Sequence, residues 1–298
     1  MHKEKVNLLG FSHESLVDFF QSIEQPSFRA LQLMKWVHQR GVIDFMQMTD
    51  FSLALRTELS EIAEVSPPKV EECLISPEGT KKYLIKLDTG SMIEMVKIPE
   101  KKRLTLCISS QAGCALQCTF CATGAQGFER NLSNAEIIGQ LWLANFHDKS
   151  SQPISNVVFM GMGEPLLNIE PVMTSISLMQ HQNAYGLSKR RITLSTSGIV
   201  PEINKLADKT DVSLAISLHA ANNILRDEIV PINKKYPLEE LLDSCKNYLK
   251  TQSKRKTITI EYILIDGVND SLDHAKDLAN ILNGLSCKIN LIPFNPSF

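Results

Sequence analysis

Three cysteines lie within eight residues of this 298-residue chain, at Cys114, Cys118 and Cys121. Thiolates are favoured ligands of iron–sulfur clusters and of zinc. Cluster iron normally takes four protein ligands and this motif offers three, so one iron of a [4Fe–4S] cluster would stay open to a small molecule. Zinc, with His219 or another cysteine as the fourth ligand, is the alternative. The motif lies among alternating strand and helix patterns, which favours the cluster.

A glycine-rich turn with a carboxylate is the second candidate feature. The segment GMGEP at 161–165 contains Gly163 and Glu164 and directly follows the apolar run at 156–160. Glycine lets the backbone approach a ligand closely, and carbonyl or carboxylate oxygens there can accept hydrogen bonds from an ammonium group. A plain turn from strand to helix has the same pattern. After a cysteine loop, the segment indicates a ligand site.

Three further strand ends are polar, at residues 195–198, 217–220 and 293–296. Any one of them can simply cap a helix or satisfy loop backbone. In a barrel of parallel strands, however, the carboxyl ends all meet at one face. The convergence of polar residues at that face favours a shared ligand.

From residue 104 onward, short apolar runs rich in β-branched residues alternate with helical patterns. Ser133, followed three residues later by Glu136, predicts a capping box at a helix start. Strands are expected at 104–108, 156–160, 191–195, 212–217, 257–264 and 288–292, and helices at 134–146, 171–181, 201–206, 237–250 and 271–282. This alternation predicts an α/β fold, a partial (β/α)6 barrel.

The first hundred residues follow a different pattern. Apolar residues recur at helical spacing after Pro26, and residues 53–62 predict another helix. Two expected strands at 82–87 and 92–98 flank the turn sequence Asp-Thr-Gly, which predicts a hairpin. We therefore expect a small accessory helical module with a hairpin over residues 1–100, and the barrel core over residues 101–298.

Composition narrows the class of protein. The hydrophobic share is 43%, the charged share 21% and the net charge −2, which is unlike a strongly basic nucleic-acid binder. Without a run of 18 apolar residues or a recognisable secretory signal, we expect a cytoplasmic protein that does not cross a membrane. Seven cysteines in such a protein indicate metal binding or catalysis rather than a disulfide framework.

Longer motifs run over essentially the whole chain and resemble, in one order, the RlmN/Cfr family of radical S-adenosylmethionine RNA methyltransferases. They are CISSQAGCALQCTFCATGAQGFERNL, NVVFMGMGEPLLN, LSKRRITLSTSG, AISLHA, RDEIVPINKKY, TIEYILIDGVND and CKINLIPFNP. The resemblance implies an enzyme that makes 2-methyladenosine in 23S rRNA and tRNA through a methyl-cysteine intermediate. It also implies a [4Fe–4S] cluster, S-adenosyl-L-methionine and an electron donor such as flavodoxin or ferredoxin. A monomer is expected.

The resemblance also assigns roles to single residues. Cys114, Cys118 and Cys121 match the cluster ligands of the family. Its S-adenosylmethionine contacts match Gly163, Glu164, Ser195, Ser217, Leu218, His219 and Asn295. Glu94 matches a proton acceptor, and Cys107 matches a cysteine that forms a disulfide with the methyl-carrying cysteine. RNA contact is expected from the accessory module and from the basic residues at 189–191.

Glu94 and Cys107 each have a simpler interpretation. Glu94 can be a charge on the solvated face of the hairpin. Alternation along the strand groups it with Met92 and Val96, however, and this apolar face favours burial and a raised pKa. Cys107 can be a small buried strand residue, as unpaired cysteines often are.

Three alternative functions fit the sequence, and the sequence differs from the family in one respect. A relative that methylates carbon-8 of adenine, a radical enzyme acting on a small molecule, and a zinc-stabilised RNA-binding protein are the alternatives. The sequence ends at Phe298 without a segment matching the one that bears the methyl-carrying cysteine. We therefore expect the chain to bind the cluster and cofactor without completing methyl transfer alone.

Overall fold

The computed structural model of the protein describes residues 5–147, 152–252 and 256–295. Within this part the chain divides into two units. The N-terminal unit contains the residues up to 109 together with 132–157 and 170–188. The C-terminal unit contains 110–131, 158–169 and the residues from 189 onward.

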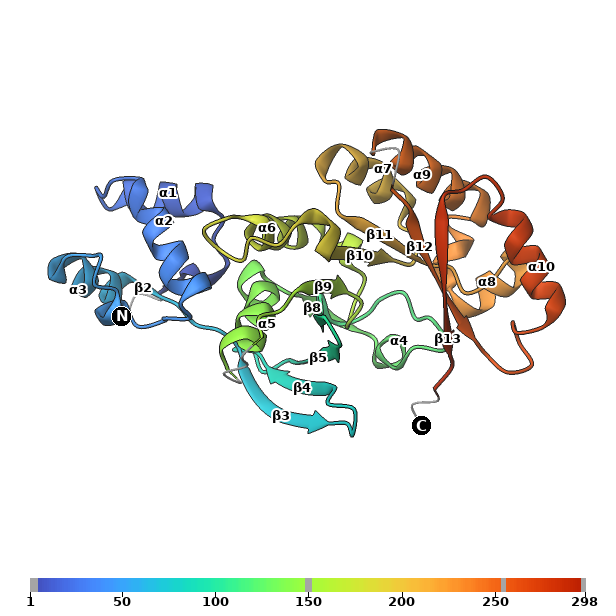
Figure 1. Ribbon diagram of the computed structural model, residues 1–298, viewed down its shortest axis with the longest axis horizontal. Coiled ribbons are helices and arrows are strands. Elements are labelled where there is room, and N and C mark those ends of the chain that lie inside the picture. The colour runs from blue at the N-terminus through green and yellow to red at the C-terminus, as the bar shows by residue number, and fades with distance from the viewer. Residues whose placement is uncertain (1–4, 148–151, 253–255, 296–298) are drawn as a thin grey trace. The chain divides into compact units, whose positions relative to one another are not determined.

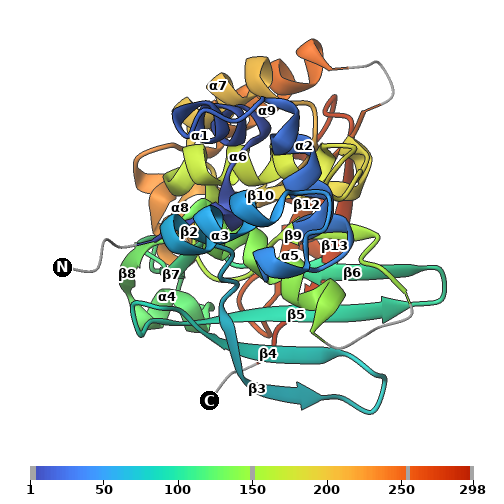
Figure 2. The same ribbon diagram turned by 90° about the vertical axis from the view of Figure 1, so that its left-hand side faces the viewer.

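The sheet of the N-terminal unit begins with four antiparallel strands that follow one another along the chain (Figure 2). They are β3 (Lys69–Ile75), β4 (Lys81–Lys86), β5 (Met92–Glu100) and β6 (Arg103–Cys107). The turn between β4 and β5 contains Gly90 at φ +88°, a backbone conformation that favours glycine. The expected hairpin is therefore present. Next to β6 comes β9 (Asn156–Phe159), whose first two residues belong to this unit.

Side-chain caps determine where helices of the N-terminal unit begin. Ser12 and Ser52 each accept a hydrogen bond from the backbone N–H three residues on. Ser133 and Glu136 form the expected capping box, with bonds of 3.3 and 2.8 Å. The helices are α1 (His13–Ser22), α2 (Phe28–Met34), α3 (Leu53–Ile62), α5 (Asn134–Phe146) and α6 (Ile169–Gln180), and β1 (Val6–Asn7) pairs with β2 (Ala63–Glu64).

The C-terminal unit contains a parallel sheet with helices between consecutive strands (Figure 1). The strands are β10 (Ile192–Thr196), β11 (Ser213–Ser217), β12 (Ile258–Leu264) and β13 (Cys287–Pro293). The residues from Leu214 to Ile216 in the middle of β11 are all buried, without alternation. This is expected for a strand whose sheet is covered on both faces. The helices are α4 (Ala122–Gln126), α7 (Val200–Lys209), α8 (Asn223–Ile229), α9 (Leu238–Thr251) and α10 (Leu272–Ile281), and the hairpin strands are β7 (Gln111–Gly113) and β8 (Phe128–Asn131).

These elements confirm the expected fold class, an α/β fold of the partial-barrel type. Every expected strand and barrel helix is present. The short elements α4, α8, β7 and β8 were not expected, because they are too short to show periodicity. The N-terminal unit extends beyond residue 100 and also contains residues 132–157 and 170–188. The division into an accessory module over residues 1–100 and a barrel core from residue 101 stays a prediction. No helix among the described residues is long and apolar enough to span a bilayer.

His38 is a buried titratable group in the N-terminal unit, and its Nδ1 lies 3.1 Å from the hydroxyl of Tyr185. Burial lowers the pKa of His38 from 6.5 to about 3. Between these values the unfolded chain binds a proton that the folded chain does not. The free energy of unfolding therefore falls as the pH falls below 6.5.

We expect His38 to cost the protein about 2 kcal/mol of unfolding free energy between pH 7 and pH 5. His38→Gln should reduce the pH dependence by this amount in urea denaturation measured at both pH values. His147 is exposed, so His147→Gln serves as the control and should keep the wild-type dependence. Equal dependence in wild type and His38→Gln would contradict the assignment.

Candidate active site

A cavity of about 270 Å³ opens at the carboxyl ends of the strands in the C-terminal unit. Most of the residues predicted to bind a cluster or a cofactor line this one space. The cysteine loop and the segment after β9 form part of its wall, and residues of β10 to β13 and the ends that follow them form the rest. The lining consists of Cys114, Leu116, Cys118, Phe120, Cys121, Thr123, Phe159, Met160, Gly161, Gly163, Glu164, Pro165, Ser195, Thr196, Ser197, Ser217, His219, Glu261, Ile263 and Ile292.

Backbone hydrogen bonds hold the cysteine loop between β7 and α4. Cys114 N donates to Gly127 O (2.8 Å), and Cys121 N donates to Cys118 O (3.1 Å). Burial raises the pKa of the Cys118 thiol to about 12 and raises that of Cys114 as well. Metal ligation replaces the thiol protons, so binding at this loop should release protons.

The three thiols are the donor type that iron–sulfur clusters bind. All three thiols line the cavity. Yet no three His, Cys, Asp or Glu side chains in the described ranges surround a point where one metal ion would sit. A [4Fe–4S] cluster binds each thiolate through a different iron, so its ligands stand further apart than those of one tetrahedral zinc.

Glu164 is a buried carboxylate held by backbone groups. One oxygen accepts a hydrogen bond from Ser197 N (2.8 Å), and the other accepts one from Leu166 N (3.1 Å). Burial raises its pKa to about 7, although the hydrogen bonds act in the opposite direction. A carboxyl group so placed can bind an ammonium group that enters the cavity.

Gly163 has little room for a side chain. Its φ is +93°, and a Cβ atom there would lie 2.4 Å from Cβ of Gln111. Gln111 in turn accepts the hydrogen bond of Glu164 N through Oε1 (2.8 Å). Glycine at 163 therefore preserves the contact that positions the backbone of Glu164.

His219 is buried, and its hydrogen bonds define its tautomer. Its Nδ1 accepts a hydrogen bond from Ile263 N (3.0 Å), and burial lowers its pKa to about 3. The ring is therefore neutral and carries its hydrogen on Nε2, where it can donate to a ligand. The ring also meets Phe120 of the cysteine loop edge-on, with centroids 4.7 Å apart.

Two predicted cofactor contacts do not line the cavity. Leu218 is buried, with its N–H donating to Glu261 O (3.0 Å). Asn295 is exposed. Ser195 and Ser217, by contrast, both reach the cavity wall.

Glu261 is a cavity residue that sequence reasoning missed. It is buried and bonded to Asn290 (2.7 Å), and burial raises its pKa. The sequence feature that could have identified Glu261 is its position as a single carboxylate within the β-branched run that forms β12. Such a residue needs a partner or a ligand when it is buried.

Glu94 and Cys107 belong to the N-terminal unit. Cys107 pairs with Val96 across β5 and β6, which puts it on the same face as Glu94. The expected burial of Glu94 is wrong, because its side chain is 41% exposed and forms an ion pair with Lys82 at 2.7 Å. The buried face of β5 carries the other residues, such as Ile93 and Met95. All seven cysteines lie in the described part of the chain, and the structure shows no disulfide there.

Replacing Glu164 by glutamine should destabilise the C-terminal unit. An amide has only one acceptor oxygen, so one of the two backbone N–H groups would face another donor. We expect Glu164→Gln to lower the free energy of unfolding by about 1–3 kcal/mol in chemical denaturation. Glu240 is exposed on α9, and Glu240→Gln should leave stability nearly unchanged. Equal stability of both variants would contradict the described role of Glu164.

Two family models match the chain. The model of the ribosomal RNA large subunit methyltransferase N-terminal domain matches residues 6–65. The model of the radical SAM superfamily matches residues 108–279.

Similar proteins cover nearly the whole chain. Dual-specificity RNA methyltransferase RlmN of Marinomonas sp. (strain MWYL1) is 55% identical over 98% of the chain and 81% of its own length. The protein of the same name from Marinobacter nauticus is 54% identical over 98% of the chain and 80% of its own length. The crystal structure of a radical SAM methyltransferase from Sphaerobacter thermophilus has a TM-score of 0.92 at 37% identity, covering 98% of this chain and 86% of that one. With a three-cysteine loop at the cavity and relatives of this identity, the chain belongs to the RlmN family of radical SAM RNA methyltransferases.

Proposed function

We propose that this protein makes 2-methyladenosine in 23S rRNA and tRNA. The observation that carries the proposal is the cavity that three loop thiols share with the buried Glu164 and the neutral His219. The relatives are named dual-specificity RNA methyltransferases, and the N-terminal match is to a ribosomal RNA methyltransferase domain. Both names support RNA as the substrate.

Cys114, Cys118 and Cys121 would hold a [4Fe–4S] cluster, and S-adenosyl-L-methionine would occupy the rest of the cavity. A cluster bound there would supply the one-electron chemistry that a radical reaction of the cofactor needs. Glu164 binds the ammonium group of the cofactor, with its oxygens oriented by Ser197 N and Leu166 N.

The other cavity residues orient the cofactor. His219 donates from Nε2, because Nδ1 is already bonded to Ile263 N. Ser195 and Ser217 add hydroxyl groups to the wall, and Gly163 keeps the backbone beside Glu164 in place. Leu218 and Asn295 stay in the proposed binding set from the family resemblance alone.

Two residues of the N-terminal unit complete the proposed machinery. Glu94 would accept the proton from carbon-2 of adenine, and its exposed side chain is accessible to a bulky substrate. Cys107, on the same face, would release the product by forming a disulfide with the methyl-carrying cysteine of the family, which no residue of this sequence matches. The roles of both rest on the family resemblance.

RNA contact is assigned to the accessory module of residues 1–100 and to the basic residues at 189–191. The latter lie just before β10, so they stand at the amino end of the strand, opposite the cavity. They would contact RNA away from the reacting base. A monomer supplied with electrons by a flavodoxin or ferredoxin completes the proposal.

Cys118→Ser should abolish the cluster, because two thiolates and a hydroxyl bind cluster iron poorly. Iron content and low-temperature EPR of anaerobically reconstituted protein measure this, with and without S-adenosylmethionine. Cys73 is exposed in β3, so Cys73→Ser is the matched control and should give the wild-type signal. Zinc in place of iron, or a cluster signal that ignores the cofactor, would overturn the proposal.

The reaction is tested by supplying 23S rRNA and tRNA, labelled S-adenosylmethionine and reduced flavodoxin to the loaded protein. Mass spectrometry of the digested RNA measures 2-methyladenosine, and its detection would support the proposed reaction and contradict the expectation that this chain does not complete methyl transfer alone. Finding 8-methyladenosine would reassign the carbon that is methylated. A label that appears only in a small molecule would refute RNA as the substrate.

A further inference from the structure

Arg226 is a charged residue of the C-terminal unit to which the proposed function gives no role. It lies on α8 in the motif RDEIVPINKKY and is fully buried, with 0% exposure. Its guanidinium makes four hydrogen bonds in the described part of the chain. The acceptors are Leu218 O (3.0 Å), Asn233 Oδ1 (2.8 Å), Ser197 O (2.7 Å) and Ser217 O (3.2 Å).

Three of these acceptors are backbone carbonyls at the ends of cavity-lining strands. Ser197 follows β10, while Ser217 ends β11 and Leu218 comes next. Ser197 also donates its N–H to Glu164, and Ser217 and His219 line the cavity on either side of Leu218. Arg226 therefore holds, from behind, the backbone that carries the proposed cofactor contacts.

The charge of Arg226 is costly to bury, and no carboxylate bonds to it directly in the part of the chain that the structure describes. The link to an acid runs through Asn233, whose Nδ2 donates to Asp227 Oδ1 (2.6 Å). Burial lowers the pKa of Arg226 to about 10, which leaves it charged at neutral pH. An apolar residue would be the cheaper choice for packing alone. What the arginine adds is several donors in a fixed planar array.

The same helix also contacts the cysteine loop. Ile229 O accepts a hydrogen bond from Thr119 N (3.1 Å), between two of the cysteines. Cys118 and Phe120 pack against a buried apolar cluster that Ile229 and Val230 form with Ala220. A displacement of α8 would therefore reach both the loop and the strand ends.

We propose that Arg226 is a positioning residue that fixes the carboxyl ends of β10 and β11 and the cysteine loop in one arrangement for cofactor binding. This rests on the proposed function and deepens it. Arg226 touches neither the cofactor nor the reacting base. It acts through Ser197, Ser217 and, by way of α8, the loop.

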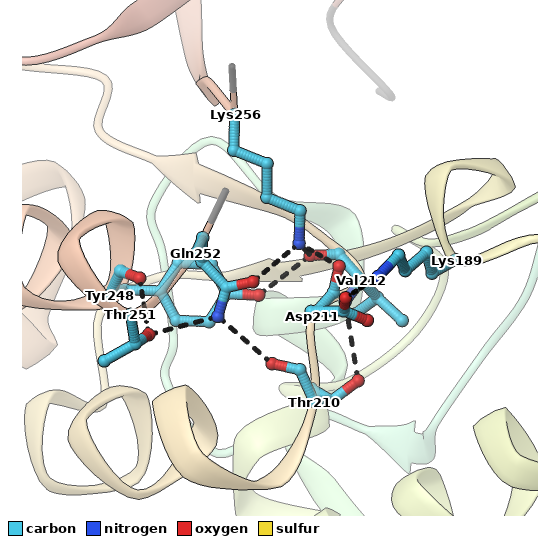
Figure 3. Close-up of polar contacts among 8 residues, drawn as sticks. All are labelled: Lys189, Thr210, Asp211, Val212, Tyr248, Thr251, Gln252 and Lys256. Atoms are coloured by element: carbon cyan, nitrogen blue, oxygen red, sulfur yellow. Dashed lines mark hydrogen bonds and ion pairs between the residues drawn. The ribbon is translucent and has the colours of Figure 1, made fainter. Parts of the chain in front are cut away.

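The opposite end of β11 offers a matched control (Figure 3). There the hydroxyl of Tyr248 donates to Val212 O (2.8 Å), and Lys256 Nζ donates to the carbonyls of Asp211 and Val212. These contacts also join side chains, a buried one for Tyr248 and a partly buried one for Lys256, to backbone carbonyls of the same strand region. They lie at the amino end, however, away from the cavity. Tyr248→Phe removes one of them with little change in shape.

The experiment compares wild type, Arg226→Lys, Asn233→Ala and Tyr248→Phe after anaerobic cluster reconstitution. Three quantities are measured: the thermal midpoint, the Kd for S-adenosylmethionine by calorimetry well below that midpoint, and the change in the cluster EPR signal when the cofactor is added. Arg226→Lys keeps the charge but loses the planar donor array. Asn233→Ala keeps the arginine and removes one of its partners, so it provides a milder variant if Arg226→Lys does not fold.

We expect Arg226→Lys to weaken cofactor binding roughly 10-fold or more and to alter the EPR response, as loss of outer contacts does at metal sites. Asn233→Ala should act in the same direction with a smaller effect. Tyr248→Phe should lower the thermal midpoint and leave Kd and EPR response at wild-type values. If the Arg226 and Asn233 variants fold and keep the wild-type Kd and EPR response, the inference about Arg226 is overturned and the proposed function still stands. Absence of any cofactor response in wild type would overturn the proposed function and the inference together.

Discussion

The polar groups at the carboxyl ends of β10 and β11 must find hydrogen-bond partners where water is largely excluded. An unpaired buried group of this kind costs about 1–3 kcal/mol. In the C-terminal unit, Glu164 accepts a hydrogen bond from the N–H of Ser197 after β10, and Arg226 donates to the carbonyls of Ser197 and Ser217.

The need to pair these buried polar groups links the residues of the proposed binding site to the stability of the fold. The carboxylate of Glu164 orients toward the cavity only because Ser197 and Leu166 hold it, and Ser197 is itself bonded through its carbonyl. Residues that never meet the cofactor are therefore part of the binding geometry. Contacts that hold binding groups in place before a ligand enters lower the entropic cost of binding.

Sequence reasoning identified the groups of the site better than their contacts. The cysteine spacing, the GMGEP turn and the capping box at Ser133 are local patterns, and local patterns can be read directly. The bond between Nδ1 of His219 and Ile263 joins residues 44 positions apart, and that of Glu164 with Ser197 joins residues 33 apart. Such pairs depend on how strands align, which no short window contains. Glu94 shows a related limit: alternation defines two faces of β5 but does not say which is buried. The buried face there includes Lys97, whose ammonium group donates to Ala144 O.

His219 occupies the left-handed region of backbone space, with φ +61°. Few residue types tolerate this conformation, chiefly glycine, asparagine, aspartate and histidine. The imidazole is at the same time needed for its contacts with Ile263 and Phe120. Glycine would suit the backbone and lose the ring, while most other side chains would suit neither. The backbone conformation and the side-chain contacts restrict substitution at this position independently. Very few residue types other than histidine satisfy both requirements.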